Sequence, residues 1–250
     1  MKRDQQTIDK RHKGIIELLK KEREMKVDEL AAIFEVSIMT MRRDLQALEE
    51  KGELIRFHGG ARYNARNVLT SEIEQEKRRE AISAYAASLV QDGESLFING
   101  SMTASAILET LKARNISVVT NNAFAAGYNK SDQIAISLTG GQLHHHIMVG
   151  DYCMRNLLMS YVDKAFLGCT GISPEGEILC DIPSELAINE TMISHAREYY
   201  ILADSHKLGR TKAMGSFTLV RPGTVITDNK APEEIIKRLE SQGMKVVLAG

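Results

Sequence analysis

Short apolar runs alternate with stretches of helical periodicity in the chain after residue 77, and this alternation constrains the fold more than any other feature. We predict seven strands, near residues 96–98, 118–120, 134–138, 165–167, 200–203, 225–227 and 246–248. We predict helices between most of them, for example over residues 80–90, 104–111, 186–196 and 233–240. Strands that alternate with helices are typical of a parallel sheet covered by helices on both faces. Residues 77–250 are therefore predicted to form an α/β domain with a doubly wound sheet.

The first 62 residues have a different character, because charged residues are frequent there and the apolar spacing is helical throughout. We predict helices over residues 9–22, 27–34 and 37–50. Asp28 is expected to cap the second helix and Ser37 the third, with Gly52 ending the third. The short β-like pieces around Gly59 and Gly60 predict a hairpin, so residues 1–62 are predicted to be a winged helix-turn-helix domain. Residues 63–76 are polar without clear periodicity and are interpreted as a linker.

Composition limits the class of protein. With 43% hydrophobic and 26% charged residues, the chain is typical of a globular protein that needs no metal or disulfide to fold. The three cysteines, Cys153, Cys169 and Cys180, are odd in number and form no CxxC pair, so buried thiols are predicted. A net charge of −1 argues against an extensive nucleic-acid coat but allows a small specific reader. No signal peptide and no membrane-length apolar run is present, so a cytoplasmic protein without a membrane partner is expected.

The third predicted helix carries the pattern of a DNA-reading helix. Spacings of three and four place Ile38, Met41, Leu45 and Leu48 on one face, which we predict to be buried. The opposite face is centred on Arg43, and arginine can bond bidentately to guanine in the major groove. The candidate DNA-binding residues are Ser37, Met39, Thr40, Arg42, Arg43 and Gln46 on this helix, and Arg56 and His58 on the hairpin. Two arginines on an amphipathic helix are often only solvated, but the preceding helices and the following hairpin favour DNA binding.

A second set of polar residues follows the predicted strands of the α/β domain. Carboxyl ends of parallel strands meet at one edge of a sheet, where ligands bind in such folds. Glycine permits close backbone approach, hydroxyl groups bind anionic oxygens, lysine supplies a cation and carboxylates accept sugar hydroxyls. The candidate effector-binding residues are Asn99, Gly100, Ser101, Thr103, Asn121, Gly140, Gly141, Glu185, Asp204 and Lys207. Each cluster alone is equally well explained as an ordinary turn.

His144, His145 and His146 are consecutive and resemble a metal-binding tract. Side chains of consecutive residues in an extended loop point in different directions, and no carboxylate or cysteine lies at ligand spacing. We therefore favour a solvated loop or the rim of a pocket, and predict no metal and no cofactor.

The segment VDELAAIFEVSIMTMRRDLQALEEKGELIRFHGGA resembles the DNA-binding signature of the DeoR family of sugar-metabolism regulators. The resemblance rests on ELA, VS, T-x-RRDL, LE-x-G and R-x-HGGA at matching spacing. It implies that Ser37, Thr40, Arg42, Arg43 and His58 belong to the surface that contacts double-stranded operator DNA.

The remainder of the chain is similar to the sensor domain of that family, which resembles the fold of ribose-5-phosphate isomerase. The similar segments are SLFINGSMTAS, VVTNN, SLTGGQL, AFLGCTGI, ADSHKLGR and VITD. The resemblance implies a repressor of a carbohydrate operon that is controlled by a phosphorylated sugar. Two positions depart from the family pattern: Asn99 stands where an aspartate is usual, and Asn189 where a lysine is usual. These departures predict a less acidic pocket, a different sugar phosphate or weaker binding.

Three functional hypotheses follow. The first is a ligand-controlled repressor that acts as a dimer or tetramer, because one small helix-turn-helix rarely supplies enough affinity alone. The second is a sugar-phosphate isomerase that carries a DNA-binding module, with Glu185 and Asp204 as its candidate acid–base groups, although we predict no catalytic residue. The third is a regulator whose partner is another protein.

Overall fold

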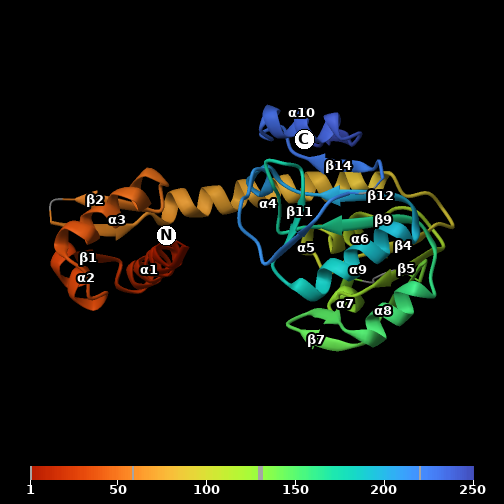
Figure 1. Cartoon of the computed structure of the whole chain (residues 1–250), viewed down its shortest axis with the longest axis horizontal. Coiled ribbons are helices and arrows are strands. Elements are labelled where there is room, and N and C mark those ends of the chain that lie inside the picture. The colour runs from red at the N-terminus through yellow and green to blue at the C-terminus, as the bar shows by residue number, and fades with distance from the viewer. Residues whose placement is uncertain (1, 58, 129–131, 220) are drawn as a thin grey trace. The chain divides into compact units, whose positions relative to one another are not determined.

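The computed structural model describes residues 2–57, 59–128, 132–219 and 221–250 (Figure 1). Contacts divide the chain after Gln75 into a first unit and a second unit, which begins at Glu76. Helix α4, Ala65–Ser88, contains residues of both. The predicted linker, residues 63–76, is thus helical from Ala65, which its lack of apolar periodicity does not suggest. Glu74–Glu80 is a run of strong helix formers, and their propensity favours a helix without an apolar stripe. The proposed domain bounds remain a prediction.

The first unit contains a helix-turn-helix followed by a wing. Its elements are α1 (Lys2–Glu22), β1 (Glu24–Lys26), α2 (Val27–Ile33), α3 (Ile38–Glu50), β2 (Leu54–Phe57) and β3 (Gly60–Tyr63). The three strands form an antiparallel sheet in the order β1-β3-β2. This arrangement confirms the predicted fold of the N-terminal part.

Capping explains where the helices of the first unit begin and end. Ser37 is the N-cap of α3, and its Oγ accepts the backbone N–H of Thr40 at 3.1 Å, as expected. Gly52 follows α3 with a φ of 73°, a left-handed conformation that glycine adopts readily. The expectation that Asp28 caps α2 is wrong. Because α2 begins at Val27, the carboxylate of Glu29 reaches back to the backbone N–H of Lys26, at 3.1 Å.

The buried face of α3 differs at one position from the predicted stripe. Met41, Leu45 and Leu48 are buried as expected, but Ile38 is 49% exposed. Ile38 is the first residue of α3, so it projects beyond the core that the three helices enclose. Asp44 is 6% exposed and takes a place on the buried face instead.

The second unit is built on a seven-stranded sheet with the order β15-β14-β12-β9-β4-β5-β6, and all its pairings are parallel. The strands are β4 (Ser95–Ile98), β5 (Ile116–Thr120), β6 (Ile134–Leu138), β9 (Val162–Gly168), β12 (Ala196–Leu202), β14 (Thr224–Thr227) and β15 (Lys245–Leu248). They correspond to the seven predicted strands, so the predicted α/β class is confirmed.

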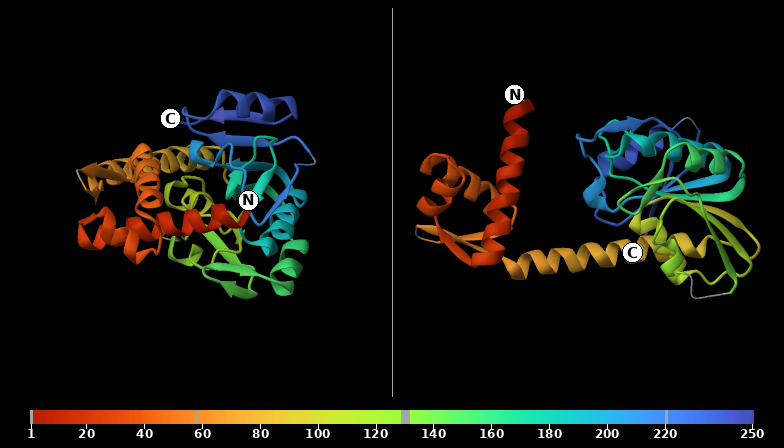
Figure 2. Two further views of the ribbon diagram at one scale, coloured as in Figure 1. Left: turned by 60° about the vertical axis from the view of Figure 1, so that its left-hand side comes forward. Right: turned by 90° about the horizontal axis from the view of Figure 1, so that it is seen from below.

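Helices cover both faces of this sheet (Figure 2). One face packs against α4, α5 (Met102–Ser105), α6 (Ile107–Thr110) and α7 (Ala125–Tyr128). The other packs against α8 (Asp151–Leu158), α9 (Pro183–Ser194) and α10 (Glu233–Ser241). Side chains alternate between the two cores, as in β4, where Leu96 and Ile98 face one core and Phe97 the other.

Smaller elements lie between the strands and were not expected. They are the hairpin of β7 (Gln142–His144) and β8 (Ile147–Val149), and an antiparallel sheet of β10 (Gly171–Ile172), β11 (Ile178–Cys180) and β13 (Gly215–Phe217). A short 3₁₀ helix, η1 (Ser205–Lys207), follows β12. Strands of two or three residues are too short to show a periodic pattern, which explains why they were missed.

The strand order reverses direction beside β4. The chain proceeds from β4 to β5 and β6 on one side, and then crosses to β9, β12, β14 and β15 on the other. The neighbours β4 and β9 therefore form the topological switch point of the sheet. In open α/β sheets this is where a crevice opens at the carboxyl ends of the strands.

Candidate nucleic-acid interface and ligand cavity

A cavity of about 290 Å³ lies at the switch point, beyond the carboxyl ends of β4, β9 and β12. Six of the ten residues predicted to bind an effector line it: Asn99, Gly100, Ser101, Thr103, Glu185 and Lys207. Other residues that line it are Arg79, Met102, His146, Ile147, Gly168, Cys169, Thr170, Cys180 and Asn189. The structure thus brings loops from distant parts of the sequence to one hollow.

Asn99 joins the two strands of the switch point. Its Nδ2 donates to the carbonyl of Gly168 at 2.9 Å and to Oδ1 of Asn189 at 3.0 Å. Its Oδ1 accepts the backbone N–H groups of Ser101 at 3.2 Å and of Gly168 at 3.0 Å. An amide offers two donors and two acceptor positions, so Asn99 is fully used within the protein. We therefore propose that Asn99 positions the cavity loops rather than contacting a ligand.

The two departures from the family pattern meet in this contact. Asn99 and Asn189 are both buried and form a neutral amide pair. Nδ2 of Asn189 also points to Sγ of Cys180, at 3.4 Å. Neither side chain brings a charge to the cavity wall, so the charge of the cavity is set by other residues.

Close packing requires glycine on both sides of the switch point. A Cβ on Gly168 would lie 1.9 Å from Oγ of Ser101, and one on Gly100 would lie 2.7 Å from Cγ1 of Ile147. Oγ of Ser101 accepts the backbone N–H of Ala104 at 3.5 Å, which holds the loop against α5. The loop of residues 99–103 therefore packs directly against Gly168, the last residue of β9.

Two cationic side chains line the cavity. Nζ of Lys207 donates to the carbonyl of Cys169 at 2.8 Å. Within the part of the chain that the structure describes, this is its only hydrogen bond, and no carboxylate lies at ion-pair distance from it. An ammonium group has three donors, so two remain for a ligand. Arg79, from α4, is the second cation.

Burial changes the acid–base properties of three groups around the cavity. It raises the pKa of Glu185 to about 7, and that of the Cys169 thiol to about 11. Burial, together with the charge of Glu185, raises the pKa of the Cys180 thiol to about 12. Both cysteines are therefore thiols rather than reactive thiolates at neutral pH, as the sequence suggests. Glu185 is divided between its neutral and ionised forms.

Glu185 is expected to make stability depend on pH. Its pKa is raised from 4.5 to about 7, so the folded protein binds more protons than the unfolded chain between these values. Stability contributed by Glu185 therefore falls as pH rises through this window. We expect Glu185→Gln to raise the stability of the second unit by about 1–3 kcal/mol at pH 8 and to change little near pH 4. Thermal melts across pH test this, and equal gains at both pH values would contradict it.

Four residues predicted to bind an effector do not line the cavity: Asn121, Gly140, Gly141 and Asp204. Asn121 is buried, and its Nδ2 donates to the carbonyl of Met148 at 3.2 Å. Gly140 and Gly141 have φ values of 68° and 114° in the turn before β7. A Cβ on Gly141 would lie 2.4 Å from the carbonyl of Val149. Gly140 and Gly141 thus serve the backbone geometry of the turn before β7, and Asn121, which follows β5, holds β8 by its side chain.

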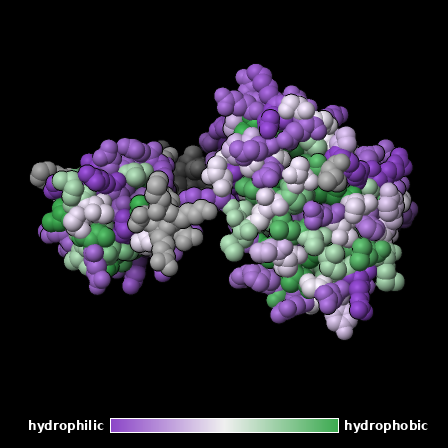
Figure 3. Space-filling view, in the orientation of Figure 1, coloured by the Kyte–Doolittle hydropathy of each residue, from purple (hydrophilic) through white to green (hydrophobic). Residues whose placement is uncertain are grey.

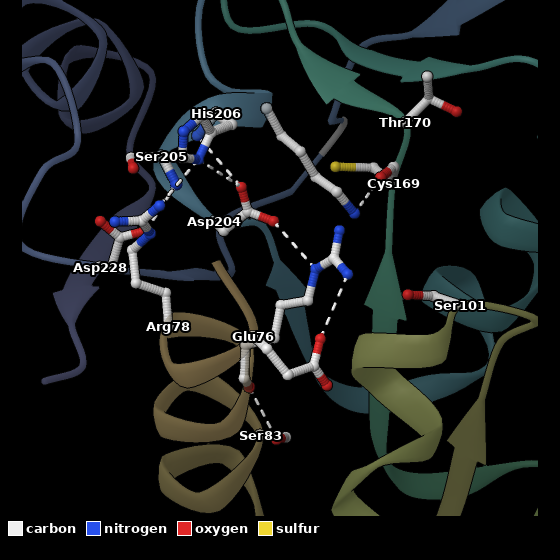
Figure 4. Close-up of polar contacts among 12 residues, drawn as sticks. Glu76, Arg78, Ser83, Ser101, Cys169, Thr170, Asp204, Ser205, His206 and Asp228 are labelled. Atoms are coloured by element: carbon white, nitrogen blue, oxygen red, sulfur yellow. Dashed lines mark hydrogen bonds and ion pairs between the residues drawn. The ribbon is translucent and has the colours of Figure 1, made fainter. Parts of the chain in front are cut away.

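Asp204 lies behind the cavity wall, and Figure 4 shows its carboxylate next to His206. Its Oδ1 accepts the backbone N–H of His206 at 3.1 Å, which caps η1. Its Oδ2 lies 3.6 Å from Nε of Arg79. Asp204 therefore contacts a residue of the cavity instead of the cavity itself.

The three consecutive histidines lie at the end of β7 and in the turn that follows it, where the rings of His144 and His145 pack edge to face with centroids 5.1 Å apart. Only His146 among them lines the cavity, where its Nε2 donates to the carbonyl of Gly100 at 3.0 Å. Its ring stacks on Phe124 with centroids 5.2 Å apart. The described residues contain no group of three side chains suited to hold a metal ion.

Several residues that line the cavity were not predicted from the sequence. Cys169 and Thr170 follow a predicted strand directly, so the rule that selected Asn99 applies to them equally. Cys180 lies on the short strand β11, which the sequence does not reveal. Arg79 lies within a helix, and no local signal marks it.

The candidate DNA-contacting residues lie on the surface of the first unit. Ser37, Met39, Arg42, Arg43, Gln46 and Arg56 are exposed, and Thr40 is half-buried. The guanidinium groups of Arg42 and Arg43 make no hydrogen bond or ion pair with other described residues. Gln46 donates to Oε1 of Glu50 at 3.1 Å, and Nε of Arg56 lies 3.4 Å from Oε2 of Glu49. His58 lies outside the described residues.

A buried ionic cluster fixes α3 to α1. Nε of Arg11 donates to Oδ2 of Asp44 at 2.6 Å, and its Nη2 to Oδ1 at 3.2 Å. Nε2 of His12 lies 3.1 Å from Oδ1 of Asp44. This bidentate contact sets the rotation of α3, and therefore the direction in which the neighbouring Arg42 and Arg43 point.

Comparison with known families gives an identification. Residues 11–67 match the DeoR-like helix-turn-helix domain, and residues 74–229 match the DeoR C terminal sensor domain. The chain belongs to the DeoR family. It is thus a transcriptional regulator, which confirms the resemblance seen in the sequence. No helix within the described residues has the length and apolar character that a membrane crossing requires.

Curated relatives of this DeoR-family regulator are similar over nearly the whole chain. The glycerol-3-phosphate regulon repressor of Escherichia coli (strain K12) is 30% identical, over 95% of this chain and 98% of its own length. The lactose phosphotransferase system repressor of Staphylococcus epidermidis is 29% identical, over 88% of this chain and 92% of its own. Among solved structures, ribose 5-phosphate isomerase A from Methanocaldococcus jannaschii has 16% identity and a TM-score of 0.39, over 53% of this chain and 54% of its own.

Proposed function

We propose that this DeoR-family regulator represses a carbohydrate-metabolism operon and that a phosphorylated sugar controls it. One observation carries the proposal: the same chain holds a helix with two guanidinium groups that no other described residue pairs, and a cavity where Lys207 has two donors that no described residue uses. The first feature suits the DNA major groove, and the second suits a phosphate. A ligand that binds the two conformations of the protein unequally would then change its occupancy of DNA.

The proposed effector has an anionic end and a hydroxyl-bearing end. Lys207 and Arg79 are placed to bind a phosphate, while Glu185 and the hydroxyl groups of Ser101 and Thr103 are suited to sugar hydroxyls. The names of the two relatives refer to a glycerol-3-phosphate regulon and to a lactose phosphotransferase system, which supports this class.

A thermal-shift screen tests the effector class. Purified full-length protein is melted with a panel of phosphorylated sugars, glycerol 3-phosphate and the unphosphorylated parent of each. Binding to the folded state raises Tm by mass action, so we expect shifts with phosphorylated members only. Equal shifts with the parents, or no shift with any member, would contradict the proposal.

Arg43 is expected to contribute sequence discrimination on DNA. If its guanidinium reads a guanine, Arg43→Ala should lower the discrimination between selected and random DNA by about 1–3 kcal/mol. The DNA is obtained by selection from random sequences with the native protein, and affinities are measured by fluorescence anisotropy. Lys51→Ala, which removes an exposed positive charge beyond the end of α3, is the matched control and should keep the discrimination. An unchanged preference in the Arg43 variant would remove Arg43 from base readout.

We further propose that the protein acts as a dimer or tetramer in the cytoplasm. A single helix-turn-helix rarely provides enough affinity, and symmetric oligomers bind paired half-sites. Apolar side chains lie scattered among hydrophilic ones on the visible face of the second unit (Figure 3). Tyr152, Met159 and Tyr161 are examples of exposed large side chains of this unit, each at least 70% exposed. Sedimentation of the full chain at micromolar concentration tests the oligomer.

A sugar-phosphate isomerase is the second candidate function. The pKa of Glu185, about 7, is suited to proton transfer at neutral pH. Against it, Asn99 supplies no acid at the first loop, and Asp204 does not reach the cavity. Turnover of ribose 5-phosphate or a related aldose phosphate, abolished by Glu185→Gln, would favour the enzyme.

A further inference from the structure

Arg79 lies between the cavity and two carboxylates. It lines the cavity, its Nη1 lies 3.6 Å from Oε2 of Glu76, and its Nε lies 3.6 Å from Oδ2 of Asp204. Both distances are too long for a good hydrogen bond. Nε of Arg79 and Oδ2 of Asp204 are buried and have no hydrogen-bond partner among the described residues. The guanidinium of Arg79 is therefore attracted to the carboxylates of Glu76 and Asp204 but forms no good hydrogen bond with either.

The acceptor side of this contact is rigid. The side chain of Asp204 is fully buried, and its Oδ1 is engaged with the backbone of His206. Asp228, at the end of β14, accepts the backbone N–H of Ser205 at 2.6 Å and fixes the same loop. Arg78 lies beside Arg79 on α4 (Figure 4). Its Nε lies 3.9 Å from Oδ2 of Asp228, and its Nη2 lies 3.3 Å from Nδ1 of His206. Two consecutive arginines thus tie α4 to the loop that carries Lys207.

An anion in the cavity would offer Arg79 better acceptors than it has now. Lys207 belongs to η1, directly after Asp204, and has donors to spare. A phosphate bound by Lys207 presents several charged oxygens, and arginine forms short bidentate bonds with such groups. The ligand and the carboxylates of Asp204 and Glu76 would then compete for one guanidinium.

We propose that Arg79 is a switch residue, which leaves Asp204 and Glu76 to bind an anion in the cavity and so reports the occupancy of the cavity to helix α4. The inference rests on the proposed function, since it needs an anionic ligand. Helix α4 extends from Ala65 to Ser88 and includes residues of both units. Loss of the contact between Arg79 and Asp204 therefore alters how α4, the helix that leads to the DNA-binding unit, is held by the rest of the second unit.

Four variants of the full-length protein test this role. Arg79→Gln removes the switch charge, and Asp204→Asn removes its buried competitor while keeping an oxygen for the backbone of His206. Glu76→Gln removes the exposed competitor and serves if the Asp204 variant fails to fold. Lys77→Gln removes one positive charge from an exposed neighbouring position of α4 and is the matched control. Inorganic phosphate is the probe, its affinity is measured by calorimetry, and hydrogen exchange is followed in peptides that cover residues 76–88.

In the native protein, phosphate is expected to change exchange in α4. Arg79→Gln should bind phosphate about 10-fold more weakly, the lower bound for one charged hydrogen bond, and should lose the exchange response. Asp204→Asn should bind phosphate more tightly, and without phosphate its α4 should exchange as in the phosphate-loaded native protein. Glu76→Gln should act in the same direction, and Lys77→Gln should behave as the native protein.

Native affinity and a native exchange response in Arg79→Gln would overturn the switch. The absence of phosphate binding to both the native protein and Asp204→Asn would overturn it as well. If phosphorylated sugars bind and require Lys207, while the Arg79 and Asp204 variants respond as the native protein does, the switch fails and the proposed function stands. If no phosphorylated compound binds at all, the proposed function fails.

Discussion

Replacement of Asp44 by alanine is expected to lower the opening free energy of the first unit by about 3–5 kcal/mol, because it leaves buried charge without its partner. Asp44 is 6% exposed and accepts two hydrogen bonds from Arg11, with His12 beside them. Without the carboxylate, the guanidinium of Arg11, which is 13% exposed, loses the group that neutralises it among the described residues. Native-state hydrogen exchange of α1 and α3 amides in the full chain measures this loss.

An exposed ion pair of the same unit is the control. Nε of Arg56 lies 3.4 Å from Oε2 of Glu49, and the two side chains are 39% and 40% exposed. Glu49→Ala should therefore change the opening free energy by no more than about 1 kcal/mol. Losses of equal size in the two variants would show that Asp44 is not the anchor of α3.

Because Asp44 also orients the neighbouring arginines, Asp44→Ala should weaken binding to selected DNA.

Lys207→Ala is expected to weaken binding of a phosphorylated ligand by about 10–100-fold, the range for a lost charge-assisted hydrogen bond. Nζ of Lys207 is held at the carbonyl of Cys169, so its charge is placed at the cavity before any ligand arrives. Calorimetric titration with the most stabilising member of the sugar panel gives the affinity. DNA binding without ligand should stay at the native level, since Lys207 belongs to the second unit.

Lys245→Ala is the matched control, because this lysine is exposed at the start of β15. Its affinity for the ligand should equal that of the native protein. Equal weakening by both variants would indicate a general charge effect, and no weakening by Lys207→Ala would remove Lys207 from the ligand site.

The sequence predicted the main sheet and the helix-turn-helix because both follow local rules. Each strand of the main sheet is an apolar run between helical stretches, and Ser37 and Gly52 mark the ends of α3 by their own backbone chemistry. The prediction that Ile38 is buried was wrong because periodicity does not tell where the core ends. The prediction that Asp28 caps α2 was wrong because the helix begins at Val27, two residues earlier than a cap at Asp28 requires.

The cavity was only partly predictable for a related reason. The rule that ligands bind at strand ends selected Asn99 and Lys207, and the structure places both at the cavity. The same rule selected Gly140 and Gly141, which form the turn before the β7–β8 hairpin, and Asn121, which bonds to Met148 of that hairpin. The strands of this hairpin are too short to predict. Arg79 and Asp44 depend on contacts between residues far apart in sequence, and no local pattern reveals such partners.

The affinity of the protein for DNA, measured with and without a ligand, tests the proposed regulator most directly. DNA selected from random sequences by the full-length protein is titrated in fluorescence anisotropy, with each phosphorylated sugar and its unphosphorylated parent added in turn. We expect a sequence-specific complex whose Kd changes at least about 5-fold, the lower range of allosteric coupling, with a phosphorylated member and not with its parent. A protein that selects no DNA sequence, or whose Kd is the same with every member of the panel, would contradict a DNA-binding regulator controlled by a sugar phosphate.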